Sequence, residues 1–269
     1  MSCRILSVAL AWLAGVVGVA DSAAAAGTPP DIAGFRLGLP AGEAYELLKK
    51  YAGPNRRIVA GHQNLPDLGP PPIIHELQMS DGDPATSSEV IEMDLTLPPQ
   101  PQRVWRIVRR VFFLPGHEVM PAPLVASLRE KYGAEVHTLG PASQGVWWLD
   151  GAGQNASLPA DMKCDGVGPQ GWIDEGIQYT LGAGTQRSDL VLPLPPVDSR
   201  FAICRTLTRV AALVQRDAHD LVNMFEVQIA DLSIDTSAHN ATVALLNQRV
   251  QEREDQRQNR AAQQPKPPL

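Results

Sequence analysis

The sequence is poor in cysteine: Cys3, Cys164 and Cys204 are the only three in 269 residues. Thiol catalysis favours a Cys-X-X-Cys pair or a Cys with a His nearby, and neither pattern is evident. A lipoprotein carries its acylated Cys after the apolar run of its leader, whereas Cys3 precedes that run. We therefore expect neither a catalytic thiol nor a lipid anchor.

The chain also lacks an excess of positive charge and, after residue 26, any long apolar run. Its formal net charge is −6, which offers no attractive field to nucleic acid or to anionic lipid. A membrane-spanning helix needs about 20 consecutive apolar residues, and no segment after residue 26 supplies them. We expect no nucleic-acid partner and no stable membrane insertion of the mature chain.

Motifs for catalysis and cofactor binding are missing as well. There is no Gly-x-Ser-x-Gly motif, and the six histidines include no pair spaced to hold zinc on a helix. The Gly-Ala-Gly stretches at Gly151 and Gly182 lack the third glycine of a phosphate-binding loop. Asp174 and Glu175 are adjacent in the chain, so they point in different directions and do not suit a hydrolase pair. We predict no catalytic residue, no metal and no cofactor.

The N-terminus has the layout of a secretory signal peptide. Arg4 precedes an apolar run from Ile5 to Ala20, and the small residues of "DSAAAAG" follow it. We expect a signal peptide at residues 1–26 and a periplasmic or secreted protein. In such an oxidising compartment the remaining pair, Cys164 and Cys204, is expected to form one disulfide.

Two segments of the mature chain share a pattern, "LPAGEAYELLKKYAG" and "MPAPLVASLREKYG". Both have Pro-Ala near the start and Lys-Tyr near the end when they are aligned at a separation of 81 residues. Apolar residues recur at helical spacing in both, after a proline and before Gly53 or Gly133. The pattern predicts two equivalent helices that bury Tyr51 and Tyr132 at their C-terminal ends.

Strand-like runs with alternating apolar and polar residues follow both segments. A helix followed by antiparallel strands, present twice, predicts an α+β protein built from two helix-plus-antiparallel-sheet units in tandem. We place these units at residues 27–116 and 117–234. The expected strands lie within Ile73–Gln78, Glu89–Pro98, Arg103–Phe113, Gly145–Asp150, Phe201–Gln215 and Asn223–Ile234.

The runs within Glu89–Pro98 and Arg103–Phe113 should form a hairpin. Face matching then places Glu92 and Asp94 next to Arg106 and Arg110 on the solvated side, with Trp105 on the opposite, buried side. An arginine row can also bind an anion. The opposing carboxylates explain the row without a ligand, and we favour that interpretation.

A short stretch, "GFRLGLPAGEAYELL", contains Gly34, Leu37 and Gly38 ahead of the first helix. It resembles the opening of the units in small outer-membrane lipoproteins of the SmpA/OmlA type, and tandem units of related shape occur in secreted β-lactamase-inhibitor proteins. The resemblance implies a non-catalytic, protein-binding module. The lipid-attachment Cys of the lipoproteins is missing here, so a membrane role is not implied.

A Gly/Trp-rich segment, residues 139–200, interrupts the second unit. Long segments of this kind are often functional, and aromatic side chains beside carboxylates can hold a sugar or a peptide. The structural alternative, in which the tryptophans cover the sheet edge and the disulfide pins the segment, is favoured because Trp is mostly buried. The candidate binding residues are Trp147, Trp148, Asp150, Asp165, Trp172 and Glu175.

Residues 235–269 are expected to form a C-terminal helix and a disordered tail. The apolar positions of the helix stop at Val250, and "QEREDQRQNR" beyond it is polar on all sides. Such a helix docks on the protein and then projects into solvent or frays. A coiled coil would need the apolar heptad to continue.

Taken together, these features predict an exported, non-enzymatic protein that binds another protein or a cell-envelope component. The alternative is a glycan-binding protein or a hydrolase with its site in residues 139–200. Two carboxylates converging beside a tryptophan in a concave pocket would favour the alternative.

Overall fold

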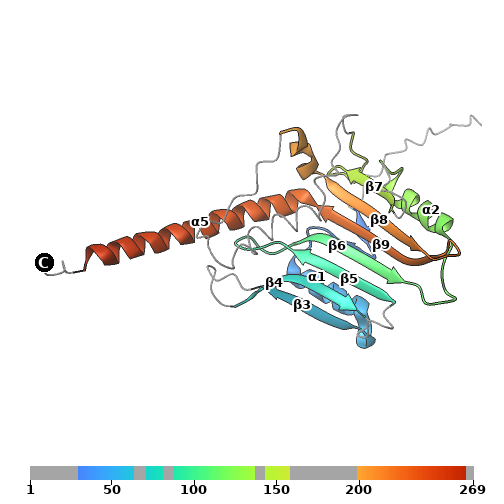
Figure 1. The fold of residues 1–269 in the computed structure, drawn as a ribbon, viewed down its shortest axis with the longest axis horizontal. Coiled ribbons are helices and arrows are strands. Elements are labelled where there is room, and N and C mark those ends of the chain that lie inside the picture. Colours follow the sequence, from blue (N-terminus) through green and yellow to red (C-terminus); the bar gives the residue numbers. More distant parts are fainter. Residues whose placement is uncertain (1–29, 64–70, 81–87, 137–142, 158–198, 265–269) are drawn as a thin grey trace, which may run out of the picture.

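The computed structural model describes residues 30–63, 71–80, 88–136, 143–157 and 199–264. These residues form one large antiparallel sheet with the strand order β3-β4-β5-β6-β9-β8-β7, as Figure 1 shows. Together with the helices, the sheet confirms the α+β class. The strands are β3 (Arg57–Gln63), β4 (Ile73–Ser80), β5 (Glu89–Leu95), β6 (Val104–Phe112), β7 (Ser143–Leu149), β8 (Thr208–Arg216) and β9 (Val222–Asp231).

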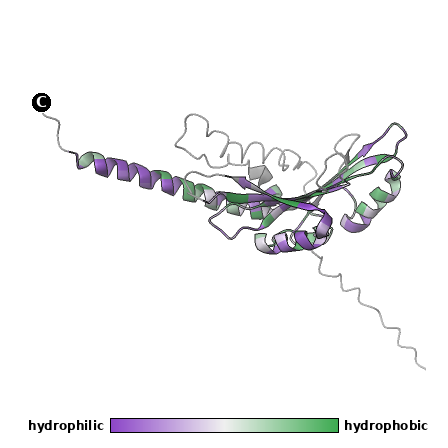
Figure 2. Ribbon diagram, turned by 90° about the horizontal axis from the view of Figure 1, so that it is seen from below, coloured by the Kyte–Doolittle hydropathy of each residue, from purple (hydrophilic) through white to green (hydrophobic). Residues whose placement is uncertain are grey.

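Helices lie on both sides of this sheet. Helix α1 (Ala41–Ala52) and helix α2 (Pro121–Tyr132) cover one face, which we call the helix face (Figure 2). Helix α5 (Leu232–Ala262) starts over the other face, the open face, and extends past the sheet. Two short 3-10 helices, η1 (Gly53–Asn55) and η6 (Ser199–Thr206), follow α1 and precede β8.

The strands expected in two units are joined in a single sheet. The last strand of each unit, β6 and β9, pair with each other in antiparallel register from Arg106 opposite Ala230 to Phe112 opposite Met224. Strand β3 was not predicted, because an edge strand in which apolar residues are consecutive, as in Ile58–Ala60, and a glycine follows has little alternation to recognise. The run from Phe201 starts as a 3-10 helix and becomes a strand only at Thr208.

Helices α1 and α2 are built alike at their C-terminal ends. Each has 12 residues and is followed by a glycine, Gly53 or Gly133, with φ of 63° and 81°. The N–H of Gly53 donates to the carbonyl of Lys49, and that of Gly133 donates to the carbonyl of Arg129. The two helices therefore correspond at a separation of 80 residues, not 81.

This shift by one residue decides which side chains are equivalent. Leu48 corresponds to Leu128, and they are 0% and 6% exposed. Tyr132 corresponds to Ala52 and not to Tyr51. Tyr51 is 37% exposed while Tyr132 is 7% exposed, so the prediction of two equivalent buried tyrosines was wrong. The reason is geometric, since one residue along a helix turns the side chain by about 100°.

A small hairpin on the helix face contacts both α1 and α2. It consists of β1 (Asp31–Ile32) and β2 (Phe35–Arg36). The ring of Phe35 meets Tyr51 of α1 edge-on at 5.4 Å between centroids. The hydroxyl of Tyr132 in α2 donates to the carbonyl of Asp31 at 2.9 Å. The hairpin thus makes contacts with both segments of the repeat and belongs to neither alone.

Hydrophobic clusters lie on both faces of the sheet. The larger one, under α1, α2 and the hairpin, includes Leu48, Ile107 and Ile229. The smaller one, on the open face, includes Trp105 and Leu232. Burying an aliphatic side chain of this size contributes roughly 2 kcal/mol. Trp105 was predicted to lie on the other side of the sheet, opposite Glu92 and Asp94.

Trp105 lies on the open face because β6 has a bulge at that position. Asp94 pairs with Arg106 and Leu95 pairs with Val104, so Trp105 has no partner in β5. An extra residue in one strand breaks the alternation of sides. The prediction that Trp105 lies on the side opposite Glu92 and Asp94 was therefore wrong, because all three line the same cavity.

Helix α5 begins three residues earlier than Asp235, the start that the sequence indicated. The carboxylate of Asp231 caps it by accepting from the N–H groups of Ser233 and Ile234 at 2.9 and 3.2 Å. The last buried residue of α5 is Leu246, and the polar outer half projects away from the sheet (Figure 2). Among the described residues, no helix combines the length and apolarity needed to span a membrane.

Candidate functional site

A cavity of about 260 Å³ lies on the open face, between the sheet and the first turns of α5. Strands β4, β5 and β6 form its floor, and α5 forms its roof. Its walls combine carboxylates, histidines and apolar side chains in a small space. The lining residues are His75, Glu76, Glu92, Asp94, Leu95, Leu97, Trp105, Arg106, Asp235 and His239.

The sheet register explains why charged side chains meet here. Glu76 pairs with Asp94, and Asp94 pairs with Arg106, so these three side chains form a row across β4, β5 and β6. Residues that face each other in antiparallel strands point to the same side of the sheet. The bulge of β6 adds Trp105 to that side.

The roof is formed by two residues one turn apart on α5. Asp235 and His239 are separated by four positions, which places them on the same face of a helix. The hydroxyl of Thr242, one turn after Ala238, donates to the carbonyl of Pro98 at 2.6 Å. This bond ties α5 to the connection between β5 and β6 and holds the roof over the floor.

One arginine forms ion pairs with two of the carboxylates. Arg106 Nη1 donates to Asp94 Oδ2 at 2.6 Å and to Glu92 Oε1 at 3.2 Å. The predicted pairing of Arg106 with these two acids is confirmed. Arg110 pairs instead with Glu226 of β9, with 2.7 Å between Nε and Oε2.

The other two carboxylates of the cavity are not neutralised in this way. Glu76 and Asp235 make no hydrogen bond or ion pair with any residue in the described part of the chain. Burial, with a further contribution from Asp94, raises the pKa of Asp235 to about 7, although Arg205 acts against the shift. Burial and the nearby Glu92 and Asp94 raise the pKa of Glu76.

His239 is the most enclosed histidine of the cavity. It is 8% exposed, and its Nε2 atom has no hydrogen-bond partner among the described residues. Burial, together with the nearby Arg205, lowers its pKa. The imidazole is therefore kept neutral, with one ring nitrogen that no described group satisfies.

The acids and histidines are not arranged as a metal centre. Within the described ranges, no three His, Cys, Asp or Glu side chains converge closely enough to hold a metal ion. The cavity also contains the aliphatic side chains of Leu95 and Leu97 and the indole of Trp105. Such a lining accommodates a ligand with carbon atoms as well as charge.

Two of the three tryptophans proposed as binding residues, Trp147 and Trp148, are packing residues in the structure. Trp147 and Trp148 are each 1% exposed, so neither indole is available at the surface. Trp147 belongs to the helix-face cluster, and its Nε1 donates to the carbonyl of Gly133 at 2.9 Å. Trp148 belongs to the open-face cluster, because successive residues of a strand point to opposite sides.

Asp150 stabilises a turn after β7. Its Oδ1 accepts from the N–H groups of Ala152 and Gln154 at 2.9 and 3.0 Å. This carboxylate is thus occupied by backbone donors. The remaining three candidates, Asp165, Trp172 and Glu175, lie outside the described residues.

The disulfide prediction concerns one described cysteine. Cys204 is fully buried in the open-face cluster and is disulfide-bonded. Cys164 lies outside the described residues, so its pairing with Cys204 stays a prediction. The signal peptide at residues 1–26 also lies outside them.

The sequence showed part of this cavity. Glu92, Asp94 and Arg106 were recognised from strand alternation, as a surface ion pair and not as a cavity wall. Asp235 and His239 have helical spacing, but a pair of polar residues on a helix is usually solvated. Only the packing of α5 against the open face identifies them as site residues.

Comparisons with models of protein families, with curated proteins and with solved structures found no match.

Proposed function

We propose that this is an exported, non-enzymatic protein that binds another protein through the end of the open face that lies away from α5. A cell-envelope component is the other partner to be tested. The proposal is carried by three apolar side chains, Phe112, Leu213 and Met224, which we call the apolar end of the open face. They come from three neighbouring strands.

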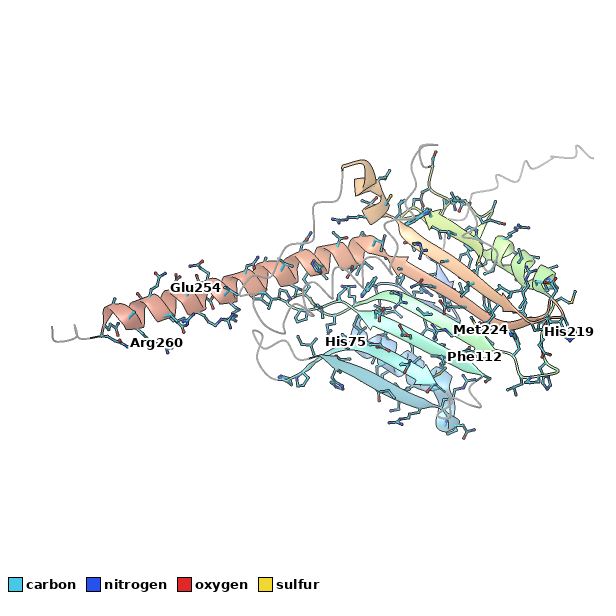
Figure 3. The ribbon with its side chains drawn as sticks, viewed as in Figure 1. His75, Phe112, His219, Met224, Glu254 and Arg260 are labelled. Atoms are coloured by element: carbon cyan, nitrogen blue, oxygen red, sulfur yellow. The ribbon has the colours of Figure 1, made fainter. Side chains whose placement is uncertain are left out.

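These side chains share one side of the sheet. Phe112 of β6 and Met224 of β9 are register partners, and Figure 3 shows them together at the end of the sheet. Leu213 of β8 pairs with Glu226, one step further along the same side of β9. Phe112 and Leu213 are 38% and 36% exposed. Apolar groups gathered in this way favour an interaction surface.

The residue types around the apolar end favour a protein partner. Arg110 and Glu226 form an ion pair at 2.7 Å beside it. Aromatic residues, Met and Arg are enriched in protein interfaces, and polar groups usually form the rim. The net charge of −6 does not attract an anionic membrane surface. The resemblance to lipoprotein and inhibitor units also implies protein binding.

The test is a site-specific crosslink. Phe112 is replaced by a photoreactive phenylalanine, and the matched control carries the same group at Tyr45 of α1, which is 40% exposed on the opposite side of the sheet. We expect a single protein adduct in envelope extracts from position 112 and none from position 45. The captured protein, once purified, should bind the wild type about tenfold more tightly than the double variant Phe112→Ser, Leu213→Ser.

Equal crosslinking from both positions would contradict the proposal, as would normal binding of the purified partner by a folded double variant. A lipid or glycan adduct at position 112 would replace the protein partner by a cell-envelope component. Circular dichroism checks that the variants are folded.

A glycan-binding or hydrolytic function is the second candidate. It is favoured by carboxylates that lie beside a tryptophan in a concave site, although the residues are Trp105, Glu76 and Asp235 and not those of residues 139–200. A screen with neutral oligosaccharides tests it. Saturable binding that Trp105→Ala abolishes would support this function over the first.

A further inference from the structure

The cavity under α5 carries more negative than positive charge. Four carboxylates line it, and the one guanidinium among its lining residues, Arg106, is shared by Glu92 and Asp94. Glu76 and Asp235 are left without a hydrogen bond or ion pair from any described residue. Both carboxylates are half-buried, and carboxylates withdrawn from water are normally paired with a cation. Arg205 acts on Asp235 but does not line the cavity. A positive charge inside the cavity would be a direct partner for both carboxylates.

His239 supports the same conclusion independently of the acids. Its side chain is more than nine-tenths buried, it lines the cavity, and its Nε2 has no partner in the described part of the protein. Buried polar atoms in proteins are generally hydrogen-bonded. A neutral imidazole can accept a hydrogen bond at one ring nitrogen, so an N–H donor inside the cavity would satisfy this atom.

The apolar part of the lining determines what kind of cation fits. Leu95, Leu97 and Trp105 border the cavity, and an indole attracts an organic cation through its face. A hydrated metal ion gains nothing from such walls. The volume of about 260 Å³ is at the small end of ligand pockets, which suits a short alkyl chain.

We propose that this cavity binds a small primary amine in its ammonium form, with the charge neutralised by Glu76 and Asp235 and one N–H donated to His239. The alkyl chain packs against Leu95, Leu97 and Trp105. The site is separate from the apolar end of the open face, as the labels of His75 and Phe112 in Figure 3 show. It therefore does not rest on the protein-binding function proposed above, and the two can fail independently.

The test is isothermal titration calorimetry of the full mature chain with four small probes at pH 8 and low ionic strength. The probes are pentylamine, 1-pentanol, pentanoate and magnesium chloride. Pentylamine is fully protonated at this pH, like a lysine side chain. We expect it to bind at least about tenfold more tightly than 1-pentanol, and we expect no measurable binding of pentanoate or magnesium.

Two cavity variants and one control locate the site. Glu76→Gln and Asp235→Asn should each weaken pentylamine binding by about fivefold or more. Glu254→Gln, on the projecting half of α5 (Figure 3), should leave it unchanged. Both cavity substitutions remove a charge that burial disfavours, so the variants should fold, and circular dichroism verifies this.

Lower pH provides a further readout. At pH 5.5 Asp235 is protonated, because its pKa lies at about 7, and pentylamine should bind the wild type more weakly than at pH 8. Equal affinity for pentylamine and 1-pentanol, full affinity in both cavity variants, or no binding of pentylamine at about 10 mM would each overturn the proposal. Magnesium binding that Asp235→Asn abolishes would also overturn it, in favour of a metal site.

Discussion

Asp235 and His239 lie one turn apart on α5, and the cavity under that helix shifts their pKa values in opposite directions. Burial raises the pKa of the Asp235 carboxyl and lowers that of the His239 imidazole. Both shifts favour the neutral form, as expected where water is excluded. The cavity therefore disfavours charge on both groups, and near neutral pH the Asp235 carboxyl is only partly ionised.

The first prediction concerns Asp235→Asn and the dependence of stability on pH. The pKa of Asp235 is about 7 in the folded protein and near 3.8 when unfolded, so the folded state holds this proton more tightly. The contribution of this group to wild-type stability should be greatest below the unfolded pKa. It should be lost as the pH rises toward and through 7. The variant lacks this loss.

Urea unfolding at pH 4 and pH 8 checks this expectation. At pH 8 the variant should be more stable than the wild type by about 1–3 kcal/mol, and near pH 4 the two should be alike. Asp94 and Arg205 act on the carboxyl in the wild type. Both residues are also present in the variant, so their own titration cancels to first order. Equal stabilities at pH 8 would contradict the raised pKa.

The second prediction concerns Glu89, a buried carboxylate near the C-terminal end of α1. It is 6% exposed, and it accepts from Arg109 Nε at 2.7 Å and from the Tyr51 hydroxyl at 2.9 Å. Arg56 Nη1 lies 2.9 Å from its other oxygen. Glu89→Ala should lower the free energy of unfolding by about 2 kcal/mol, because Arg56 and Arg109, whose side chains are 28% and 33% exposed, lose their common partner.

Chemical denaturation measures this loss, with Glu46→Ala on the exposed side of α1 as the control. The control should change stability by less than about 0.5 kcal/mol. A loss at Glu89 no larger than the loss at Glu46 would show that the buried network adds nothing.

The third prediction concerns the glycines that end α1 and α2. Gly53 and Gly133 have φ of 63° and 81°, a region that costs other residues about 1 kcal/mol or more. Alanine at either position should destabilise the protein. Gly133→Ala should cost more, since its Cβ would lie 3.0 Å from Asn155 Nδ2, whereas nothing lies within 4 Å of a Cβ at Gly53.

Gly42→Ala serves as the opposite control. Gly42 lies inside α1 with open space around it, so alanine should stabilise the protein by about 0.5 kcal/mol. Thermal unfolding of the three variants gives the order. Stabilisation by Gly53→Ala or Gly133→Ala would contradict the shared helix ending.

The fourth prediction concerns the projecting half of α5. Deleting residues 251–269 removes no buried residue of the helix, so the midpoint of thermal unfolding should change by no more than about 2 °C. Deleting residues 242–269 removes Thr242, Val243 and Leu246, which are buried, and should be strongly destabilising. A large loss from the shorter deletion would show that the outer half contacts the protein.

Local patterns predicted much of the secondary structure. The runs around Glu89–Leu95 and Val104–Phe112 are strands, as alternation indicated, and Arg106 meets Glu92 and Asp94 as expected. Both helices end at the expected glycines. These features depend on residues close together in the chain or on one face of a hairpin, so the sequence carries the information directly.

The predictions failed where a shift by one residue moves a side chain to another side of its helix or strand. The identity of Lys50-Tyr51 and Lys131-Tyr132 suggested an alignment that the helix endings exclude. The bulge at Trp105 moved that side chain to the open face. Neither shift leaves a clear pattern, because the hydrophobic residues involved suit either face.

By itself, the sequence determined the α+β class, most of the strand segments and the pairing of Arg106 with Glu92 and Asp94, because short-range periodicity sets which face of an element is apolar. Only the tertiary structure decided that β6 pairs with β9 in one sheet and that α5 closes a cavity over Glu76, Asp94 and Arg106. The physical reason is that these contacts join residues far apart in the chain. Their pairing depends on how whole faces pack, which no local pattern specifies.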